Sequence, residues 1–150
     1  MATLIKNGTV VNADGQSRSD VLFEGETIAR VAHDIPAESH TIVDATGLLV
    51  MPGGVDVHTH LDMPFGGTVS ADDYRTGTIA AAVGGTTTVI DFVLQSRGHT
   101  MAEALETWLA KSNGKACIDF GLHMAVTDLG PGDGAQGLEE METMVEKGIS

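Results

Sequence analysis

Two histidines separated by a single residue, His58 and His60, have the clearest chemical potential in this sequence. They stand at the end of a short apolar run that begins at Val55, as expected for a β-strand. Alternate side chains of a strand share one face, so His58 and His60 should point the same way. Their Cα atoms would lie about 6.6 Å apart, close enough for both rings to reach one ion at about 2.0–2.1 Å. The pattern therefore predicts that His58 and His60 bind a metal ion.

Three other polar residues lie near this pair in the expected fold. Asp56 shares the face of the histidines, and it either orients a ligand or satisfies nearby backbone groups. Asp91 and His123 stand at the ends of two later apolar runs, where we expect structural roles with satisfied hydrogen bonds. None of the three is predicted to be catalytic. No G-x-S-x-G motif occurs, and the single cysteine, Cys117, is expected to be a small core residue.

A glycine-rich segment, Gly132 to Gly137, matches the G-x-G-x-x-G pattern of dinucleotide-binding loops. In such loops the first glycine follows a strand directly. Here Asp128 to Pro131 separate the segment from a strand expected to end near Thr127. We therefore expect a flexible loop and no organic cofactor.

The elements that position these residues fall into two regions. Residues 1–50 alternate short β-rich runs with turn dipeptides such as Asn7-Gly8, which predicts a small antiparallel sheet without helices. Residues 51–150 alternate apolar strands with helical patterns, which is typical of βα units in a parallel sheet. The expected strands cover residues 55–59, 86–92 and 118–125, with a fourth beginning near Ile149. The expected helices begin near Ser70 to Asp73, at Thr100 and near Leu138, and they end at Gly84, Asn113 and Lys147.

The spacing of the strand ends distinguishes between α/β architectures. His58, Asp91 and His123 are separated by 33 and 32 residues, and a (β/α)8 barrel of about 250 residues repeats every 31 residues or so. We therefore predict an α/β fold in which residues 51–150 form the first three βα units of a TIM barrel. Residues 1–50 would form the N-terminal part of a small antiparallel β-sandwich domain. Three units do not close a barrel, so we expect a larger enzyme, with residues 1–150 inactive alone.

Composition excludes several classes of partner. The 8 Lys and Arg against 21 Asp and Glu give a net charge of −13, which argues against nucleic acid or an anionic membrane as the main partner. No apolar run approaches the ~18 residues of a membrane span, and no secretory signal is evident. We therefore expect a cytoplasmic protein.

The segment Asp56 to Gly67 resembles the metal-binding start of the dihydropyrimidinases and hydantoinases, which are cyclic amidohydrolases. Gly84 to Thr88 leading into Asp91, and Gly121 to Ala125, are similar to the same family. The resemblance implies that His58 and His60 bind one ion of a dinuclear, usually zinc (Zn2+), centre. It also implies that a carboxylated lysine after residue 150 bridges the ions, that the acid/base aspartate lies later still, and that the enzyme is a homotetramer. No catalytic residue is therefore expected within residues 1–150.

The reaction implied by the resemblance is hydrolysis of a dihydropyrimidine or hydantoin to an N-carbamoyl amino acid by a metal-activated hydroxide. Two ions about 3.5–4 Å apart lower the pKa of water and polarise the amide carbonyl. Dihydroorotases usually carry arginine two residues after the second histidine, where this sequence has Asp62, and a carboxylate there favours neutral rings. Three alternatives stay open: an allantoinase, a dihydroorotase-like enzyme and a non-catalytic scaffold like the collapsin-response mediators. The intact histidine pair weighs against the scaffold.

Overall fold

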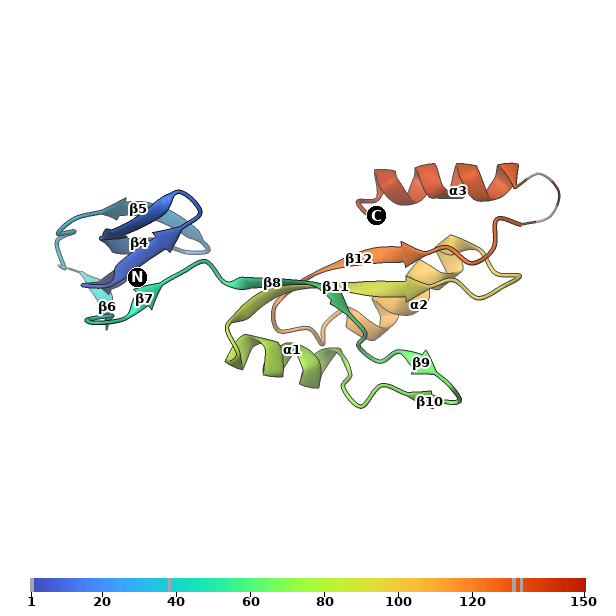
Figure 1. Cartoon of the computed structure of the whole chain (residues 1–150), viewed down its shortest axis with the longest axis horizontal. Coiled ribbons are helices and arrows are strands. Elements are labelled where there is room, and N and C mark those ends of the chain that lie inside the picture. Colours follow the sequence, from blue (N-terminus) through green and yellow to red (C-terminus); the bar gives the residue numbers. More distant parts are fainter. Residues whose placement is uncertain (1, 38, 131, 133) are drawn as a thin grey trace. The chain divides into compact units, whose positions relative to one another are not determined.

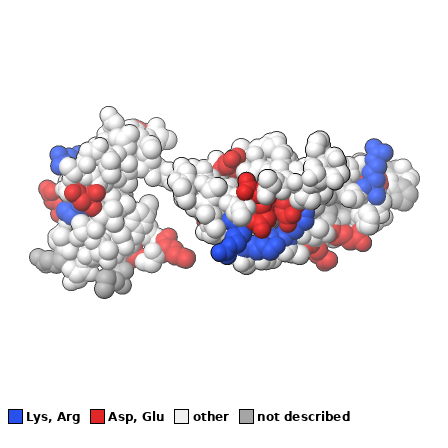
Figure 2. Space-filling view, turned by 90° about the horizontal axis from the view of Figure 1, so that it is seen from below, with Lys and Arg blue, Asp and Glu red and all other residues white. Residues whose placement is uncertain are grey.

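The computed structural model describes residues 2–37, 39–130, 132 and 134–150. The chain divides into two compact units, Met1–Pro52 and Gly53–Ser150, and each is described by itself. Within the described residues, the helices are too short or too polar to cross a bilayer. Acidic and basic side chains are interspersed on the face shown in Figure 2.

The first unit is built from two β-sheets, and its described residues contain no helix (Figure 1). One sheet has the strand order β5-β4-β1-β6, and the other has the order β3-β2-β7. The strands are β1 (Ala2–Lys6), β2 (Thr9–Asn12), β3 (Gly15–Arg18), β4 (Asp20–Glu24), β5 (Thr27–Ala32), β6 (His40–Asp44) and β7 (Leu49–Val50).

The prediction of an antiparallel sheet is wrong for two strand pairs of this unit. β1 runs antiparallel to β4 but parallel to β6, and β2 runs antiparallel to β3 but parallel to β7. Turn dipeptides report hairpins between consecutive strands, whereas β6 and β7 reach their partners through longer connections that leave no local signal. Both sheets are therefore mixed.

A buried carboxylate ties the strands of the first sheet together. Asp20 is 5% exposed. Its carboxylate accepts hydrogen bonds from Lys6 Nζ at 2.9 Å and from the amides of Asn7 and Ile35 at 3.0 and 2.9 Å. Burial alone would raise the pKa of Asp20, but these three donors together outweigh it and lower the pKa below its usual value.

The second unit alternates strands with helices along the chain (Figure 1). Its three-stranded sheet has the order β12-β11-β8, and both neighbouring pairs are parallel. Helices α1 and α2 contact β11, and α3 contacts α2. The unit is therefore a mixed α/β structure, and its three described parallel strands form an open sheet. The main elements are β8 (Gly54–Thr59), α1 (Tyr74–Val83), β11 (Thr86–Leu94), α2 (Met101–Ser112), β12 (Asp119–Ala125) and α3 (Ala135–Glu146).

A short hairpin that the sequence analysis did not predict lies between β8 and α1. It pairs β9 (Pro64–Phe65) with β10 (Thr68–Val69). The two residues of its turn, Gly66 and Gly67, have φ angles of 58° and 82°. A two-residue turn with positive φ at both positions strongly favours glycine, because a Cβ would be strained there. The Gly-Gly dipeptide was therefore a usable hairpin signal.

Capping boxes fix where the first two helices begin. Asp73 caps α1, and its carboxylate accepts the Thr76 amide at 2.8 Å. Thr100 caps α2, where its hydroxyl accepts the Glu103 amide at 3.1 Å. The start predicted at Thr100 is confirmed, and of the residues proposed for the first helix it is Asp73 that caps it. Helix α3 begins earlier than expected, after Gly134, which has a φ angle of 78°.

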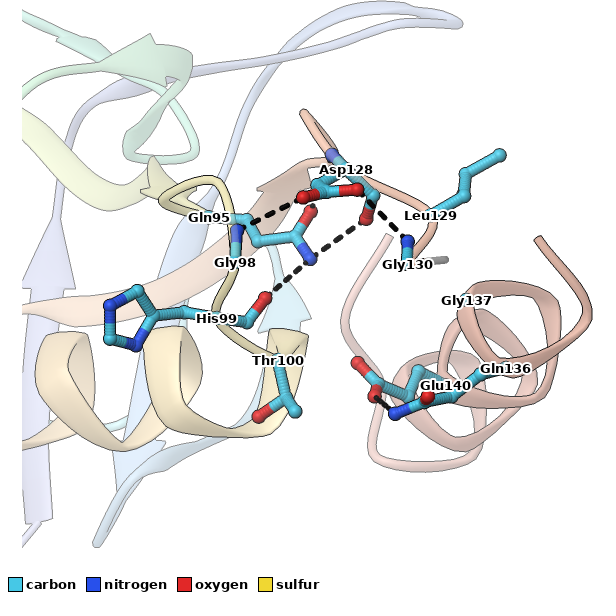
Figure 3. A pocket seen from close by; sticks show the side chains of 10 residues that line it. All are labelled: Gln95, Gly98, His99, Thr100, Asp128, Leu129, Gly130, Gln136, Gly137 and Glu140. Atoms are coloured by element: carbon cyan, nitrogen blue, oxygen red, sulfur yellow. Dashed lines mark hydrogen bonds between the residues drawn. The ribbon is translucent and has the colours of Figure 1, made fainter. Parts of the chain in front are cut away.

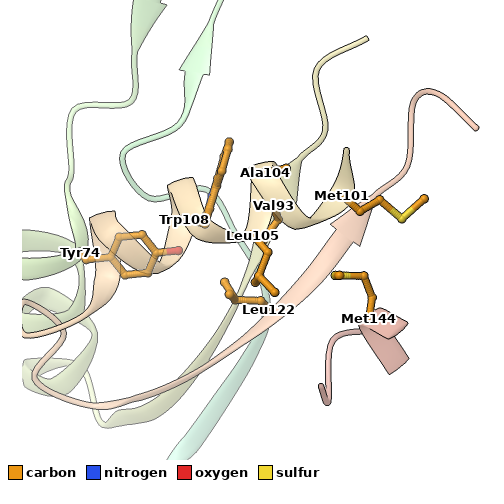
Figure 4. Packing of buried hydrophobic residues seen from close by; sticks show 8 residues of the cluster. All are labelled: Tyr74, Val93, Met101, Ala104, Leu105, Trp108, Leu122 and Met144. Atoms are coloured by element: carbon orange, nitrogen blue, oxygen red, sulfur yellow. The ribbon is translucent and has the colours of Figure 1, made fainter. Parts of the chain in front are cut away.

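The core of the second unit lies between the sheet and its helices. Figure 4 shows its side chains converging from α1, α2, β11, β12 and α3. Along β11 the burial alternates, with Val89, Asp91 and Val93 buried and the residues between them less so. Cys117, expected in a core, is exposed, because it lies in the connection between α2 and β12. The cluster comprises Tyr74, Val93, Met101, Ala104, Leu105, Trp108, Leu122 and Met144.

The strand expected near Ile149 is not formed as a strand, but Ser150 already pairs with β12. The Ser150 amide donates to Leu122 O at 3.4 Å, and Ser150 O accepts the Met124 amide at 2.7 Å. Ser150 thus bonds to the residues before and after His123, which is the hydrogen-bond pattern of a parallel pair of strands. Backbone at Ser150 therefore lies alongside β12, on the edge away from β11.

Candidate metal centre

The two predicted metal ligands lie side by side at the end of β8. Their Nε2 atoms are 3.2 Å apart, and both side chains are exposed. A tetrahedral zinc ion bound at about 2.0–2.1 Å holds two ligand nitrogens about 3.3 Å apart. The geometry of His58 and His60 therefore fits one shared ion. In the absence of an ion, the same separation allows one Nε2–H group to donate to the other nitrogen.

An aromatic side chain of the neighbouring strand supports both imidazoles. The Phe92 ring on β11 lies 4.5 Å from the His58 ring and 5.6 Å from the His60 ring, between centroids. On its other side it lies 5.2 Å from the ring of His123. Because Phe92 and His123 are paired across parallel strands, these rings share one face of the sheet. Phe92 therefore limits how far the two imidazoles can tilt toward the sheet.

His123 and Asp91, which the sequence places at equivalent strand ends, face opposite sides of the sheet. His123 pairs with Phe92 and faces the histidine pair, whereas Asp91 pairs with the buried Leu122. His123 Nδ1 lies 2.6 Å from the Ser150 hydroxyl. Within the described residues, no group of three or more His, Cys, Asp or Glu side chains is arranged to hold a metal ion. Two imidazoles, those of His58 and His60, are therefore brought together. Metal binding by them stays a prediction.

Asp56, on the same strand as the pair, makes a local hydrogen bond. Its Oδ1 accepts the backbone amide of His58 at 3.1 Å, and its side chain is exposed. Asp56 was expected either to orient a metal ligand or to satisfy nearby backbone groups, and this hydrogen bond matches the second alternative. It also constrains the backbone of His58 directly.

Asp91 lies beneath the pair and is fully buried. It accepts the Tyr74 hydroxyl at 2.6 Å and the Leu61 amide at 3.3 and 3.2 Å to its two oxygens. It also accepts the amide of Phe92 at 2.9 Å. The satisfied hydrogen bonds expected of Asp91 are confirmed. Burial and the adjacent carboxylate raise the pKa of the Tyr74 hydroxyl, which therefore stays protonated and donates.

The backbone just beyond the pair is held from other sides as well. Lys111 Nζ on α2 donates to Asp62 O at 2.6 Å, and the Asp62 amide donates to Asp72 O at 2.8 Å. Leu61 packs against α1 at Gly77, where a Cβ would come within 2.4 Å of the leucine side chain. Three elements therefore fix the exit of the chain from β8.

A cavity of about 500 Å3 lies where the loops after β11 and β12 meet (Figure 3). Gln95 joins the loops, because its Nε2 donates to His99 O and Asp128 O and its Oε1 accepts the amides of Thr127 and Asp128. All the hydrogen-bonding groups of this buried amide are engaged. Gln95 therefore locks the two loops together, and its own amide has no free group for a ligand.

The glycine-rich segment is explained by packing. Residues 126–134 separate β12 from α3, so the segment does not follow the strand directly. At Gly137 a Cβ would lie 2.6 Å from Leu129 Cα and O, which leaves room only for glycine. Asp133 lies outside the described residues.

Comparison with known proteins decides the family. The model of the amidohydrolase family matches residues 49–147, which include the histidine pair and helices α1, α2 and α3. The chain belongs to the amidohydrolase family.

This amidohydrolase-family chain is similar to curated enzymes over nearly all its residues. It is 46% identical to a D-hydantoinase of Geobacillus stearothermophilus over 147 residues, which cover 98% of the chain and 30% of that protein. It is 46% identical to a dihydropyrimidinase of Dictyostelium discoideum, covering 98% of the chain and 29% of the relative. The crystal structure of dihydropyrimidinase from Brevibacillus agri NCHU1002 superposes with a TM-score of 0.93 at 48% identity, covering 99% of this chain and 32% of that one. The resemblance to dihydropyrimidinases and hydantoinases is thereby confirmed, and the chain spans about a third of the length of these relatives.

Sequence reasoning missed several residues that organise this amidohydrolase site. Tyr74, Phe92 and Lys111 were not singled out, since each acts through a partner far away in the sequence. One signal was present: Asp91 interrupts the apolar strand Thr86–Leu94, and a carboxylate in a buried run must find donors.

Proposed function

We propose that the protein is a metal-dependent hydrolase that opens the cyclic amide bond of dihydropyrimidines or hydantoins to give N-carbamoyl amino acids. The observation that carries this proposal is the 3.2 Å approach of His58 Nε2 and His60 Nε2 at the end of a parallel strand. Membership of the amidohydrolase family and the similarity to D-hydantoinases and dihydropyrimidinases support the reaction class.

The proposal extends to the architecture in which the site would operate. Residues 51–150 would supply the first three βα units of a (β/α)8 barrel, and residues 1–50 the N-terminal part of a β-sandwich domain. The open parallel sheet β12-β11-β8 supports this, because its histidine pair lies at the carboxyl end, where the active sites of such barrels are found.

The metal would be held here by His58 and His60. We infer that two zinc ions would be held there together with a carboxylated lysine located after residue 150. Such ions, when bound, lower the pKa of water and polarise an amide carbonyl. Within this chain, the two imidazoles would fix the position of the site, and Phe92 would shield them on the side of the sheet. Asp62 would disfavour substrates that carry a carboxylate.

The experiment replaces His58 and His60 one at a time. His58→Ala or His60→Ala should lower zinc content and abolish hydrolysis of dihydrouracil and hydantoin, because an ion losing one of few ligands loses affinity and geometry. His33→Ala is the matched control, since His33 is exposed in the first unit. Full zinc content and normal activity in His60→Ala would overturn the proposal.

A substrate panel separates the related activities. Allantoin and dihydroorotate would be tested beside dihydrouracil and hydantoin. Preference for allantoin, or for dihydroorotate despite Asp62, would replace the proposed substrate class while keeping the metal chemistry. Zinc binding without hydrolysis of any of the four would favour the scaffold. The cytoplasmic location and the homotetramer stay predictions, to be checked by fractionation and by light scattering.

A further inference from the structure

Asp91 is the one charged side chain of the second unit that is fully buried among the described residues. Within that part of the chain, no lysine, arginine or histidine forms an ion pair with it. Its compensation comes from neutral donors: the Tyr74 hydroxyl and the amides of Leu61 and Phe92. A buried carboxylate without a cation is costly, and an apolar residue at this place in a strand would avoid the cost.

The donors of Asp91 connect it to both sides of the histidine pair. Leu61 follows His60 directly in the chain, and its amide reaches both carboxylate oxygens, at 3.3 and 3.2 Å. Phe92, whose amide donates at 2.9 Å, carries the ring that lies 4.5 Å from the ring of His58. One carboxylate therefore ties the backbone behind one imidazole to the strand that supports the other.

The Tyr74 hydroxyl fixes the carboxylate in turn. It reaches Asp91 Oδ2 at 2.6 Å from the first residue of α1, which Asp73 caps. Tyr74 is itself fully buried. The carboxylate is therefore held between a helix start and the backbone after β8, with little freedom to rotate.

We propose that Asp91 is a positioning residue of the candidate metal centre: by holding the Leu61 amide, it sets the place at which His60 presents Nε2 beside that of His58. The inference rests on the proposed function. The hydrogen bond from Lys111 to Asp62 O is a second anchor on the same segment, from the side of α2. A displacement of the backbone at Leu61 would also displace the imidazole of His60, one residue before it.

The test compares three variants of the protein: Asp91→Asn, Tyr74→Phe and Ser112→Ala. The Leu61 amide donates to both carboxylate oxygens. Asparagine keeps the shape of the side chain but replaces one of these oxygens by an N–H donor, so the Leu61 amide keeps one weaker hydrogen bond and faces a second donor. In Tyr74→Phe, phenylalanine keeps the buried ring but removes the hydroxyl that donates to Asp91 Oδ2. Ser112 is the control, because it is also fully buried and its hydroxyl donates within α2, to Trp108 O at 3.0 Å.

Two readouts are measured. The first is hydrogen exchange of the Leu61 amide in metal-free protein, which should become about tenfold faster in Asp91→Asn because a hydrogen bond of this kind contributes about 1–1.5 kcal/mol. The second is the zinc dissociation constant from competition with a chelator, which should rise about tenfold or more. Tyr74→Phe should shift both readouts in the same direction by less, and Ser112→Ala should lower stability and leave both unchanged.

The outcomes separate this inference from the proposed function. If the wild-type protein binds no zinc, the proposed function and the metal centre both fail. If it binds zinc, unchanged Leu61 exchange and zinc affinity in Asp91→Asn overturn the positioning role alone. If Asp91→Asn does not fold, Tyr74→Phe decides, and equal behaviour of Tyr74→Phe and Ser112→Ala reduces Asp91 to a structural residue. Cobalt substitution adds a signature, since altered ligand geometry changes the visible spectrum and a stability effect does not.

Discussion

Each of the two units buries one aspartate among its described residues, and the two compensate its charge in different ways. In the first unit Asp20 has a cation, because Lys6 Nζ lies 2.9 Å from its carboxylate. In the second unit Asp91 has the Tyr74 hydroxyl and two backbone amides. An ion pair is attractive over a range of geometries, whereas neutral donors must each be aimed at the oxygen they satisfy.

The difference indicates what each carboxylate does. Asp20 joins β1, β4 and the loop at Ile35. Asp91 joins the backbone after β8 to α1 and lies under the histidine pair. We therefore expect substitutions of Asp20 to act on stability alone, and those of Asp91 to act on stability and geometry together.

The largest effect is expected from Asp91→Ala. The buried Tyr74 hydroxyl and the partly buried amides of Leu61 and Phe92 lose their acceptor. At about 1–3 kcal/mol each, partly relieved by relaxation, the free energy of unfolding should fall by about 3–5 kcal/mol. Denaturant-dependent hydrogen exchange of β11 amides measures it. Asp14→Ala, at an exposed turn, should cost less than about 0.5 kcal/mol. A loss below about 1 kcal/mol in Asp91→Ala would show that its hydrogen bonds are not important for stability.

Asp20→Asn should cost about 2 kcal/mol at neutral pH, because it removes one half of a buried pair whose lysine is partly exposed. The pKa of Asp20 is lowered on folding, so the unfolded chain binds its proton at a higher pH. The stability that Asp20 contributes is therefore complete above the pKa of the unfolded side chain, about 3.9. It is lost as the pH falls through the lowered pKa of the folded protein. Exchange of β1 amides from pH 7 to 2 should show wild type and variant converging in acid. A constant difference over this range would contradict the ion pair.

A double replacement distinguishes stability from geometry at Asp91. Adding Tyr74→Phe to Asp91→Leu removes the hydroxyl that the single variant leaves unsatisfied, so about 1–2 kcal/mol of stability should return. Zinc affinity should stay as low as in Asp91→Leu, because the Leu61 amide is still free. Recovery of both properties together would mean that Asp91 affects the metal centre only through stability.

The smallest effect is expected at an exposed carboxylate. Asp73→Ala removes the cap of α1 and should lower the midpoint of thermal unfolding by a few degrees. Hydrogen bonds from the Thr76 amide are the main reason that the pKa of Asp73 is lowered, so the effect should shrink at acid pH. A loss of stability equal to that of Asp91→Ala would contradict the view that the burial of a carboxylate determines how much stability its removal costs.

Local features of this chain were predictable from sequence, and long-range partners were not. Thr100 with Glu103 defines a helix start, and His58 with His60 defines one face of a strand, because each pattern acts within four residues. The parallel partner of β1 and the donors of Asp91 come from residues far along the chain, and nothing local specifies them. The choice between a barrel and another open α/β sheet also depends on such distant pairing.

The strand order β8-β11-β12 has a consequence for how this unit folds. Each strand lies beside the one before it in the chain, so both pairings close loops of similar length, about 30 residues. Such loops carry nearly equal closure entropies, and no pairing has to wait for a distant segment. During synthesis, each βα unit can dock onto its predecessor as it leaves the ribosome. The histidine pair, carried on the first of these strands, would then be in place before the later strands arrive.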